Sequence, residues 1–294
     1  MKPAPFDYVR PASLDEALAL LSADPDARPI AGGQTLVPMM AMRLARPSRL
    51  VDIARIDGLR GIREDGDVIA FGAATRQVEA ERSPLVAGKL PLLAAALPWV
   101  GHPPTRNRGT VGGSIANADP AAEIPLVLTT LAGSVVVHDG KQRTEIKTED
   151  LFLGPMTTAL APGAMVIEAR FPVWREARVG VGFHEVSARK SDFAYVSAAA
   201  QVALGPDGKC IRATLGIGGA TPVPTRLDAV ANALAGTALS NADIERAVAG
   251  AAGDLEIMHD AHASDAYRRR VATGLAIRAL SDARDAAIGK TGGR

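Results

Sequence analysis

Two glycine pairs carry the strongest chemical signal in the sequence. The first pair, Gly32-Gly33, is followed by Gln34 and Thr35 and stands between a predicted strand and a predicted helix. Glycine lets backbone N–H groups approach an anion closely, and a following helix presents its N-terminus to negative charge. The pair therefore indicates an anion site, although many strand-to-helix turns carry two glycines for geometric reasons alone.

The second pair, Gly112-Gly113, lies within residues 105–123, a stretch of small and polar side chains. We expect residues 101–113 to form a polar loop without regular structure, and loops of this length in a compact domain are usually functional. The alternative is a surface Ω-loop with helix caps. The groups suited to a pyrophosphate and its ribose are the hydroxyls of Thr110 and Ser114, the N–H groups of Gly112 and Gly113, the Asn117 amide, and the carboxyl of Asp119 or Glu123.

Neither segment is a standard nucleotide-binding motif. The run from Gly216 to Thr221 lacks the last glycine of the Gly-x-Gly-x-x-Gly pattern. Gly289-Lys290-Thr291 resembles the end of a phosphate-binding loop, but Arg284 stands where the earlier glycine is required, and a helix precedes the segment. These departures argue against both the dinucleotide fold and the P-loop.

The composition is that of an ordinary globular protein. The chain has 294 residues, which suggests about two domains, or three small ones. Lys and Arg number 33 against 32 Asp and Glu, and this balance argues against a nucleic-acid or anionic-membrane binder that works through bulk charge.

The single cysteine, Cys210, allows neither an internal disulfide nor a cysteine-ligated metal cluster, and we expect it to be buried and inert. The N-terminus does not read as a signal peptide. The longest apolar run, residues 90–100, contains two prolines and is too short to span a bilayer. We therefore expect a soluble, cytoplasmic protein with no membrane span.

Hydrophobic periodicity and turn signals predict the elements that must position the two glycine pairs. A capping box, Ser13 to Glu16, marks the start of the first helix. The predicted helices cover residues 14–22, 34–44, 75–80, 84–97, 121–131, 225–234, 241–252 and 265–287. The predicted strands cover residues 28–31, 50–53, 61–63, 68–71, 134–138, 142–146, 165–170, 181–186, 196–204 and 211–217.

Two further features have plain structural interpretations. His259 and His262 stand three residues apart without an evident third ligand, so we expect surface histidines. Arg268, Arg269 and Arg270 are expected to make ion pairs on a helix surface, with contact to a partner subunit as the alternative.

Taken together, the two glycine segments resemble a known family. Gly-Gly-Gln-Thr-Leu with Pro-Met-Met, then Gly-His-Pro, Arg-Asn-Arg-Gly-Thr-Val-Gly-Gly-Ser and Ala-Asp-Pro-Ala-Ala-Glu, are similar to the FAD-binding medium subunits of molybdenum hydroxylases. The resemblance covers essentially the whole chain. It includes the C-terminal pattern Phe183-His184-Glu185 followed by Arg189-Lys190-Ser191-Asp192-Phe193-Ala194.

The resemblance implies an α+β fold with a two-subdomain FAD-binding unit of the vanillyl-alcohol-oxidase (PCMH) type. A C-terminal α+β domain, a three-stranded sheet with helices, would follow it. The expected parts are FAD-binding subdomain 1 over residues 1–56, subdomain 2 over 57–175, the C-terminal domain over 176–289 and a flexible tail over 290–294.

FAD is the cofactor that the resemblance implies, and we expect it to be non-covalent, because the first glycine loop offers no His or Cys for attachment. No metal site is expected on this chain. The implied cofactor-binding residues are Ala31, Gly32, Gly33, Gln34, Thr35 and Leu36 on one side of the pyrophosphate, Thr110, Gly112, Gly113, Ser114 and Asn117 on the other, Asp119 and Glu123 near the ribose, Leu160 at the ring system, and His102, Lys190 and Asp192.

Reduced flavin bears negative charge, which a nearby Lys190 would stabilise. The alternative for Lys190 and Asp192 is a surface ion pair.

The implied function is electron transfer. A large molybdopterin subunit would oxidise the substrate, a small two-iron two-sulfur subunit would pass the electrons to FAD, and an external acceptor would receive them. A dimer of such heterotrimers is expected, and no residue of this chain need be catalytic. One alternative is a self-contained non-covalent FAD oxidase or reductase, for which only His102 and Glu185 offer acid–base groups near the motifs. Another is a flavin-free scaffold subunit.

Overall fold

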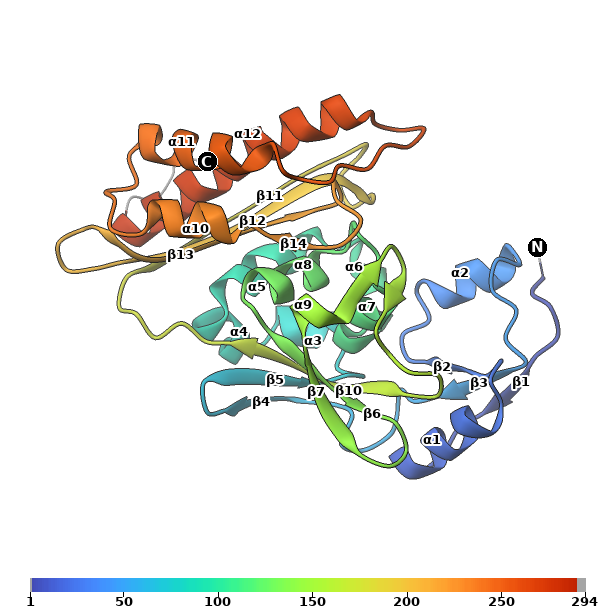
Figure 1. The fold of residues 1–294 in the computed structure, drawn as a ribbon. Coiled ribbons are helices and arrows are strands. Elements are labelled where there is room, and N and C mark those ends of the chain that lie inside the picture. The colour runs from blue at the N-terminus through green and yellow to red at the C-terminus, as the bar shows by residue number, and fades with distance from the viewer. Residues whose placement is uncertain (1, 290–294) are drawn as a thin grey trace.

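The first sheet of the fold is small and parallel. In the computed structural model, which describes residues 2–289, its strands are β1 (Asp7–Val9), β2 (Arg28–Ile30) and β3 (Arg49–Asp52), in the order β1-β3-β2. Parallel neighbours need crossover connections, which α1 (Leu14–Ala23) and α2 (Leu36–Ala41) supply here (Figure 1). Half of the predicted capping box of α1 is confirmed, since the Ser13 hydroxyl accepts from the Glu16 N–H. The Glu16 carboxylate accepts from the Ala12 N–H and not from that of Ser13, which a capping box requires.

The second sheet is antiparallel and is built on a long central strand. Its order is β4-β5-β10-β6-β7, and four of the predicted strands pair as two hairpins, β4 with β5 and β6 with β7. The central strand pairs with β5 on one side and with β6 on the other, and Phe71 and Phe171 meet edge to face in the core, 5.2 Å apart. The strands are β4 (Ile62–Asp65), β5 (Val68–Gly72), β6 (Ser134–His138), β7 (Arg143–Lys147) and β10 (Met165–Pro172).

Short helices cover this second sheet, and they correct two predictions. The elements are α3 (Gln77–Glu81), α4 (Pro84–Lys89), α5 (Pro91–Ala96), a 3-10 turn (Leu97–Trp99), α6 (Pro103–Arg108), α7 (Val111–Asn117), α8 (Glu123–Thr130), α9 (Thr148–Leu151) and a small hairpin of β8 (Phe152–Gly154) and β9 (Thr157–Thr158). The predicted helix over 84–97 is divided at Leu90, because Pro91 has no N–H and restricts the residue before it.

The stretch 101–113 is also not the irregular loop that we expected. Pro103 opens α6 at its first helical positions, and the Thr110 hydroxyl caps α7 by accepting from the Gly113 N–H at 3.1 Å. Glycine has a low helix propensity, so the presence of Gly112 and Gly113 argues against a helix here when the sequence alone is considered.

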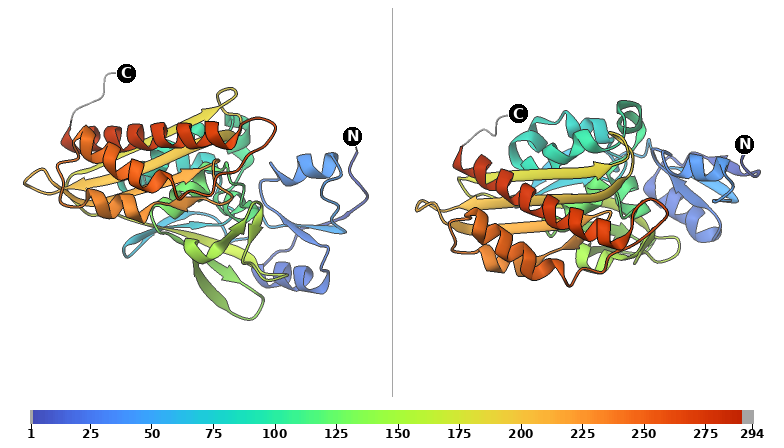
Figure 2. Two further views of the ribbon diagram at one scale, coloured as in Figure 1. Left: turned by 45° about the horizontal axis from the view of Figure 1, so that its top comes forward. Right: turned by 90° about the horizontal axis from the view of Figure 1, so that it is seen from above.

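The C-terminal sheet has three long antiparallel strands, as expected, and a fourth of two residues. Its order is β11-β12-β13-β14, and three helices cover one face of it (Figure 2). The predicted helix over 225–234 begins only at Asp228, after β14. The elements are β11 (Val179–Ser187), β12 (Ala194–Leu204), β13 (Cys210–Gly218), β14 (Thr225–Arg226), α10 (Asp228–Leu234), α11 (Asn241–Ala252) and α12 (Asp265–Ile288).

The opposite face of the C-terminal sheet packs on the helices of the preceding part. The Thr214 hydroxyl of β13 donates to the Thr130 carbonyl of α8 at 2.6 Å, and Phe183 of β11 packs against Trp99. Phe183 and Ala199 belong to the same buried cluster as Phe71 and Phe171. Cys210 is buried, as expected. Among residues 2–289, no helix combines the length and apolar character that a membrane span requires.

Candidate cofactor site

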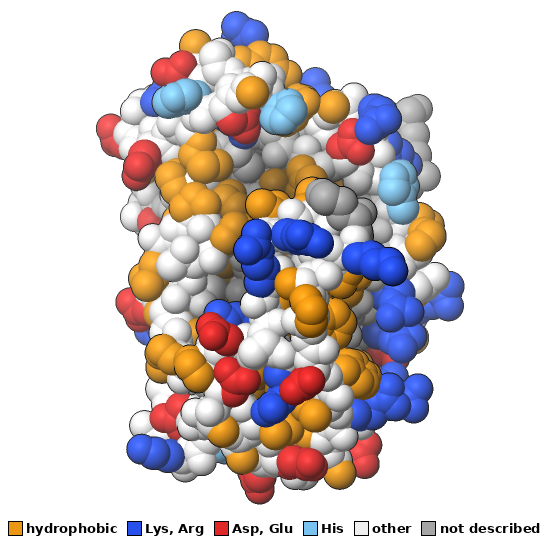
Figure 3. All heavy atoms as spheres, turned by 90° about the vertical axis from the view of Figure 1, so that its right-hand side faces the viewer, with side chains coloured by type: hydrophobic (Ala, Val, Ile, Leu, Met, Phe, Trp, Pro, Cys, Tyr) orange, Lys and Arg blue, Asp and Glu red, His pale blue; other side chains and the backbone are white. Residues whose placement is uncertain are grey.

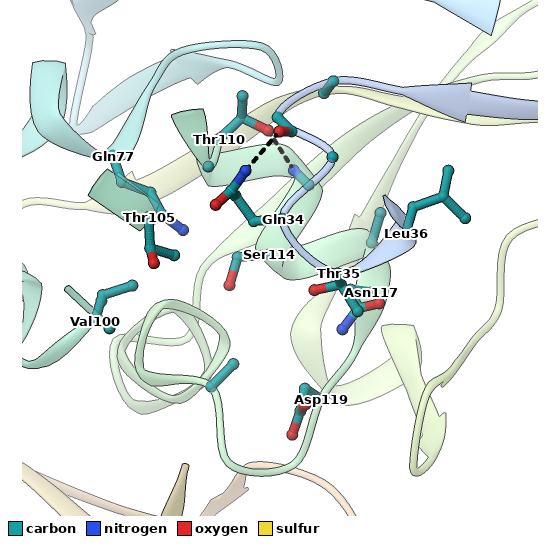
Figure 4. A pocket seen from close by; sticks show the side chains of 18 of the residues that line it. Gln34, Thr35, Leu36, Gln77, Val100, Thr105, Thr110, Ser114, Asn117 and Asp119 are labelled. Atoms are coloured by element: carbon teal, nitrogen blue, oxygen red, sulfur yellow. Dashed lines mark hydrogen bonds between the residues drawn. The ribbon is translucent and has the colours of Figure 1, made fainter. Parts of the chain in front are cut away.

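Both glycine turns line one cavity of about 920 Å³, which is of the size that ligand sites usually have. Figure 4 shows side chains of both segments, among them Gln34, Thr35, Ser114 and Asn117, around a single space. Every predicted cofactor residue lines this cavity except Lys190. The two segments that the sequence singles out are therefore brought together by the fold.

The first turn presents a row of backbone donors. Gly33 has φ +69°, a left-handed conformation that glycine adopts without strain. Among the described residues, the N–H groups of Gly32, Gly33, Gln34 and Thr35 have no hydrogen-bond acceptor. Successive N–H groups around a left-handed residue form a concave anion site.

The second glycine pair lies in the first turn of helix α7 and acts differently from our expectation. The Gly112 N–H donates to the Ala73 carbonyl at 3.0 Å, and the Gly113 N–H donates to the Thr110 hydroxyl oxygen. These two N–H groups are already used within the fold, so they are not available to a pyrophosphate. The groups that this segment offers to a ligand are the hydroxyls of Thr110 and Ser114 and the Asn117 amide.

Glycine is required where the first turn meets the backbone between α6 and α7. A Cβ on Gly32 would lie 2.2 Å from the Arg108 carbonyl oxygen and 2.7 Å from the Gly109 Cα. The turns therefore pack backbone against backbone, which no larger residue permits. A Cβ on Gly112 would lie 2.5 Å from the Ala73 Cβ, so the second segment is held equally close to the strand end behind it.

Basic side chains gather around the first turn. Figure 3 shows Lys and Arg side chains beside a hollow on the face that carries the N-terminal part of the chain. A second cavity, of about 620 Å³, shares Gly32 and Gly33 with the first. Its basic lining residues are Arg10, Arg55, Arg76 and Arg108. This positive charge favours an anionic ligand at the turn.

Three residues that line the cavity, Gln77, Tyr195 and His262, carry no sequence signal of a role there. Gln77 carries a buried side-chain oxygen without a hydrogen-bond partner among the described residues, and no sequence signal marked it. Tyr195 and His262 are stacked, with ring centroids 6.2 Å apart. His262 is exposed, as we expected of a surface histidine, but it also forms part of the cavity wall.

The loop after β11 also differs from expectation. Asp192 pairs with Arg189 at 3.0 Å, and both line the cavity. Lys190 is exposed and does not line it. The ion pair that we considered as the alternative for Lys190 and Asp192 is therefore made by the neighbouring arginine.

Arg268 is buried rather than exposed, which corrects the prediction of a surface ion pair. Its guanidinium donates to the carbonyls of Tyr195 and Gly219 and to the carboxylate of Asp260. The Asp260 carboxylate in turn accepts from the His262 N–H at 2.8 Å. This network ties the loop that carries His262 to the strand that carries Tyr195. Charged residues in a triplet give no sequence signal of such burial.

Two carboxyl groups, one in the cavity wall and one outside the cavity lining, have raised pKa values. Burial raises the pKa of Glu123 to about 7 against the opposing effect of a hydrogen bond from its own backbone N–H; the charge of Asp119 adds to the rise and that of Arg106 opposes it. Burial raises the pKa of Glu185 to about 8, and the charge of Glu123 raises it further. Glu123 lines the cavity at the start of α8.

The arrangement fits FAD. Four unpaired N–H groups and nearby arginines suit a diphosphate, and glycines keep the backbone close to it. Hydroxyl, amide and carboxyl groups of the second segment suit a ribityl or ribose chain, and the cavity is large enough for more than a nucleotide fragment.

Two family models match the chain. Residues 4–174 match the FAD binding domain in molybdopterin dehydrogenase, and residues 182–283 match the CO dehydrogenase flavoprotein C-terminal domain.

Curated relatives match over nearly their whole length. The chain is 38% identical to the 6-hydroxypseudooxynicotine dehydrogenase complex subunit alpha of Paenarthrobacter nicotinovorans, over 96% of each chain. It is 33% identical to the carbon monoxide dehydrogenase medium chain of Afipia carboxidovorans, over 97% of this chain and 98% of the relative.

Solved structures are also similar. Carbon monoxide dehydrogenase from Hydrogenophaga pseudoflava superposes with a TM-score of 0.93 at 32% identity, covering 97% of this chain and 99% of the other. Quinoline 2-oxidoreductase from Pseudomonas putida 86 gives the same TM-score and identity, covering 98% and 100%.

Proposed function

Because this chain belongs to the FAD-binding medium subunits of the molybdenum hydroxylase family, we propose that it receives electrons from an iron–sulfur partner through FAD and passes them to an external acceptor. It is an oxidoreductase subunit. FAD supplies the capacity to take up and release electrons, and the chain supplies its position, its electrostatic surroundings and its shielding from water.

The observation that carries the proposal is that the two glycine segments line one cavity and are in contact, Gly32 with the backbone of Arg108 and Gly109. The N–H groups of residues 32–35 would receive the diphosphate from one side, and the hydroxyls of Thr110 and Ser114 with the Asn117 amide from the other. Charge-assisted hydrogen bonds of this kind contribute about 1.5–3 kcal/mol each. Since the first loop carries Gln34 and Thr35, FAD is held without a covalent bond.

The remaining predicted contacts follow from the lining of the cavity. Asp119 and Glu123 would lie at the sugar, Leu160 at the ring system, and His102 and Asp192 at the cavity wall. Lys190 is not among these contacts with FAD, because it does not line the cavity. No residue of this chain acts as acid, base or nucleophile on the organic substrate.

The partners in this proposal are a large molybdopterin subunit and a small two-iron two-sulfur subunit, assembled as a dimer of heterotrimers in the cytoplasm. Support comes from the relatives, which are named as medium chains or as subunits of complexes. The substrate is then bound by another polypeptide.

Titration of the flavin-depleted full chain with FAD tests the proposal. We expect one FAD per chain, released intact on denaturation. In Gly32→Ala the new Cβ meets backbone of the other turn, so we expect at least about tenfold weaker binding, a loss of ~1.4 kcal/mol. The matched control is Gly88→Ala, where a Cβ meets nothing within 4 Å.

Failure of the wild-type chain to bind FAD would overturn the proposal in favour of a flavin-free scaffold. FAD-dependent turnover of a small alcohol or amine by this chain alone would favour a self-contained oxidase or reductase, with His102 at the cavity as its acid–base group.

A further inference from the structure

Glu185 is a buried carboxyl group that electron transfer by itself does not require. It stands on β11 next to His184, whose Nε2 pairs with Asp282 of α12 at 2.8 Å. Side chains alternate along a strand, so Glu185 points to the opposite face, the one that packs on α8. Its partner in the strand register is Ser197 of β12.

This carboxyl group lacks hydrogen-bond partners. Both oxygens of Glu185 and the Ser197 hydroxyl are buried, and none of them has a partner among the described residues. A Cβ on Gly218 would meet both the Ser197 Oγ at 2.8 Å and the Leu126 side chain of α8 at 3.1 Å, so the polar group lies at the contact between sheet and helix. A buried carboxylate without donors is costly unless it binds a proton.

Glu123 connects this buried group with the cavity. It opens α8, lines the cavity and acts electrostatically on Glu185. The charge of the neighbouring Asp119 disfavours ionisation of Glu123 and so favours its protonated form.

In the described part of the chain, the backbone N–H of Glu123 and the charge of Arg106 favour ionisation of Glu123. The Arg106 guanidinium is, however, already bound to the Glu81 carboxylate at 2.9 and 3.1 Å and to the carbonyls of Val100 and Gly101. The helix α5, which also packs on β11, carries no titratable side chain, and Asp282 faces His184 on the other side of the sheet.

We propose that Glu123, in the wall of the cofactor cavity, and Glu185, behind it on the sheet face that packs on α8, form a proton-holding carboxyl pair, and that its protons offset the negative charge of bound FAD. The inference rests on the proposed function, since FAD brings two phosphate charges into the cavity. When negative charge in the cavity increases, the pair takes up protons from water, and no bond of the cofactor forms or breaks. The raised pKa values of both groups, about 7 and about 8, support this.

The test is the dissociation constant of FAD from the full chain between pH 6 and pH 9. Binding is expected to weaken as pH rises through 7 and 8, by up to about tenfold per pH unit for each proton that FAD binding draws in. Glu185→Gln removes one of these protons while it keeps size and polarity, so we expect at least half of the pH dependence to disappear. Glu245→Gln, an exposed change of the same charge on α11, is the control and should behave as wild type.

A second measurement uses the wild-type chain and does not depend on the variant folding. Infrared spectra at pH 6 should show a protonated carboxyl band that shifts on FAD binding and is lost near pH 9. Three results would each overturn the proposed carboxyl pair. They are the absence of this band, a dissociation constant of FAD that does not depend on pH, and a folded Glu185→Gln chain whose dissociation constant changes with pH as steeply as that of the wild type. Failure to bind FAD at every pH would instead overturn the proposed function.

Discussion

At the scale of single residues, the glycines of the two turns have different roles. Gly33 gives the first turn its left-handed conformation and leaves a row of N–H donors unused, which suits an anion. Gly112 uses its own N–H inside the fold and instead allows the backbone to approach Ala73. Glycine therefore serves anion binding in the first segment and close backbone packing in the second.

Gly112→Ala should consequently affect stability. The added Cβ would lie 2.5 Å from the Ala73 Cβ and 2.6 Å from its Cα, so backbone must move. We expect the free energy of unfolding to fall by about 1–3 kcal/mol, the usual cost of overpacking, measured by urea unfolding of the flavin-free chain. An unchanged urea midpoint would show that Gly112 and Ala73 are packed less closely than the structure indicates.

At the scale of elements, the C-terminal sheet and its longest helix are packed unusually closely. Cβ atoms on Gly180 and Gly182 of β11 would lie 2.0 and 2.1 Å from carbonyl oxygens of Ala283 and Ala279 on α12. The small alanines of the helix and the glycines of the strand together bring the two backbones into contact. This contact fixes the strand whose other face carries Glu185 toward α8.

Gly182→Ala should separate α12 from β11. Because the obstacle is backbone of a long helix rather than a flexible side chain, we expect at least about 2 kcal/mol of destabilisation, seen as a lower denaturant midpoint. Gly274→Ala, an exposed position on the same helix with nothing within 4 Å, should raise stability by up to about 1 kcal/mol. Equal effects of the two substitutions would contradict this packing argument.

At the scale of the whole molecule, two carboxyl groups with raised pKa values lie where the C-terminal sheet packs on the FAD-binding part. The pKa of Glu123 is about 7 in the folded chain against an ordinary value of 4.5, and that of Glu185 is about 8. The folded chain binds these protons more tightly than the unfolded chain does. Their contribution to stability is complete below about pH 4.5 and is lost as pH rises through 7 and 8.

The free energy of unfolding of the flavin-free chain should therefore fall between pH 6 and pH 9. For Glu123, which is almost fully buried, the expected loss is on the order of 2 kcal/mol. Glu123→Gln should remove that part of the fall, so the difference between variant and wild type isolates it from other titrating groups. Urea unfolding at three pH values measures it, and parallel curves for the two chains would contradict the prediction.

The fold could be predicted from the sequence wherever the signals are local. The helices α1 and α11 begin at the caps that Ser13 and Ser240 form, and hydrophobic periodicity places their ends within a residue. The three long strands of the C-terminal sheet match their predicted ends or extend beyond them by one or two residues. Local signals did not predict α6 and α7, because proline and glycine are typical of loops. These two segments are helical because of contacts with residues that are distant along the chain.

The two glycine motifs by themselves determined which segments would form the candidate site and which family the chain resembles. This was possible because such motifs consist of a few residues that are adjacent in the sequence. Only the tertiary structure decided which N–H groups stay unpaired, that Arg268 is buried, and that Glu185 faces α8 near Glu123. Hydrogen-bond partners and burial depend on residues that are distant along the chain, so a local sequence pattern does not predict them.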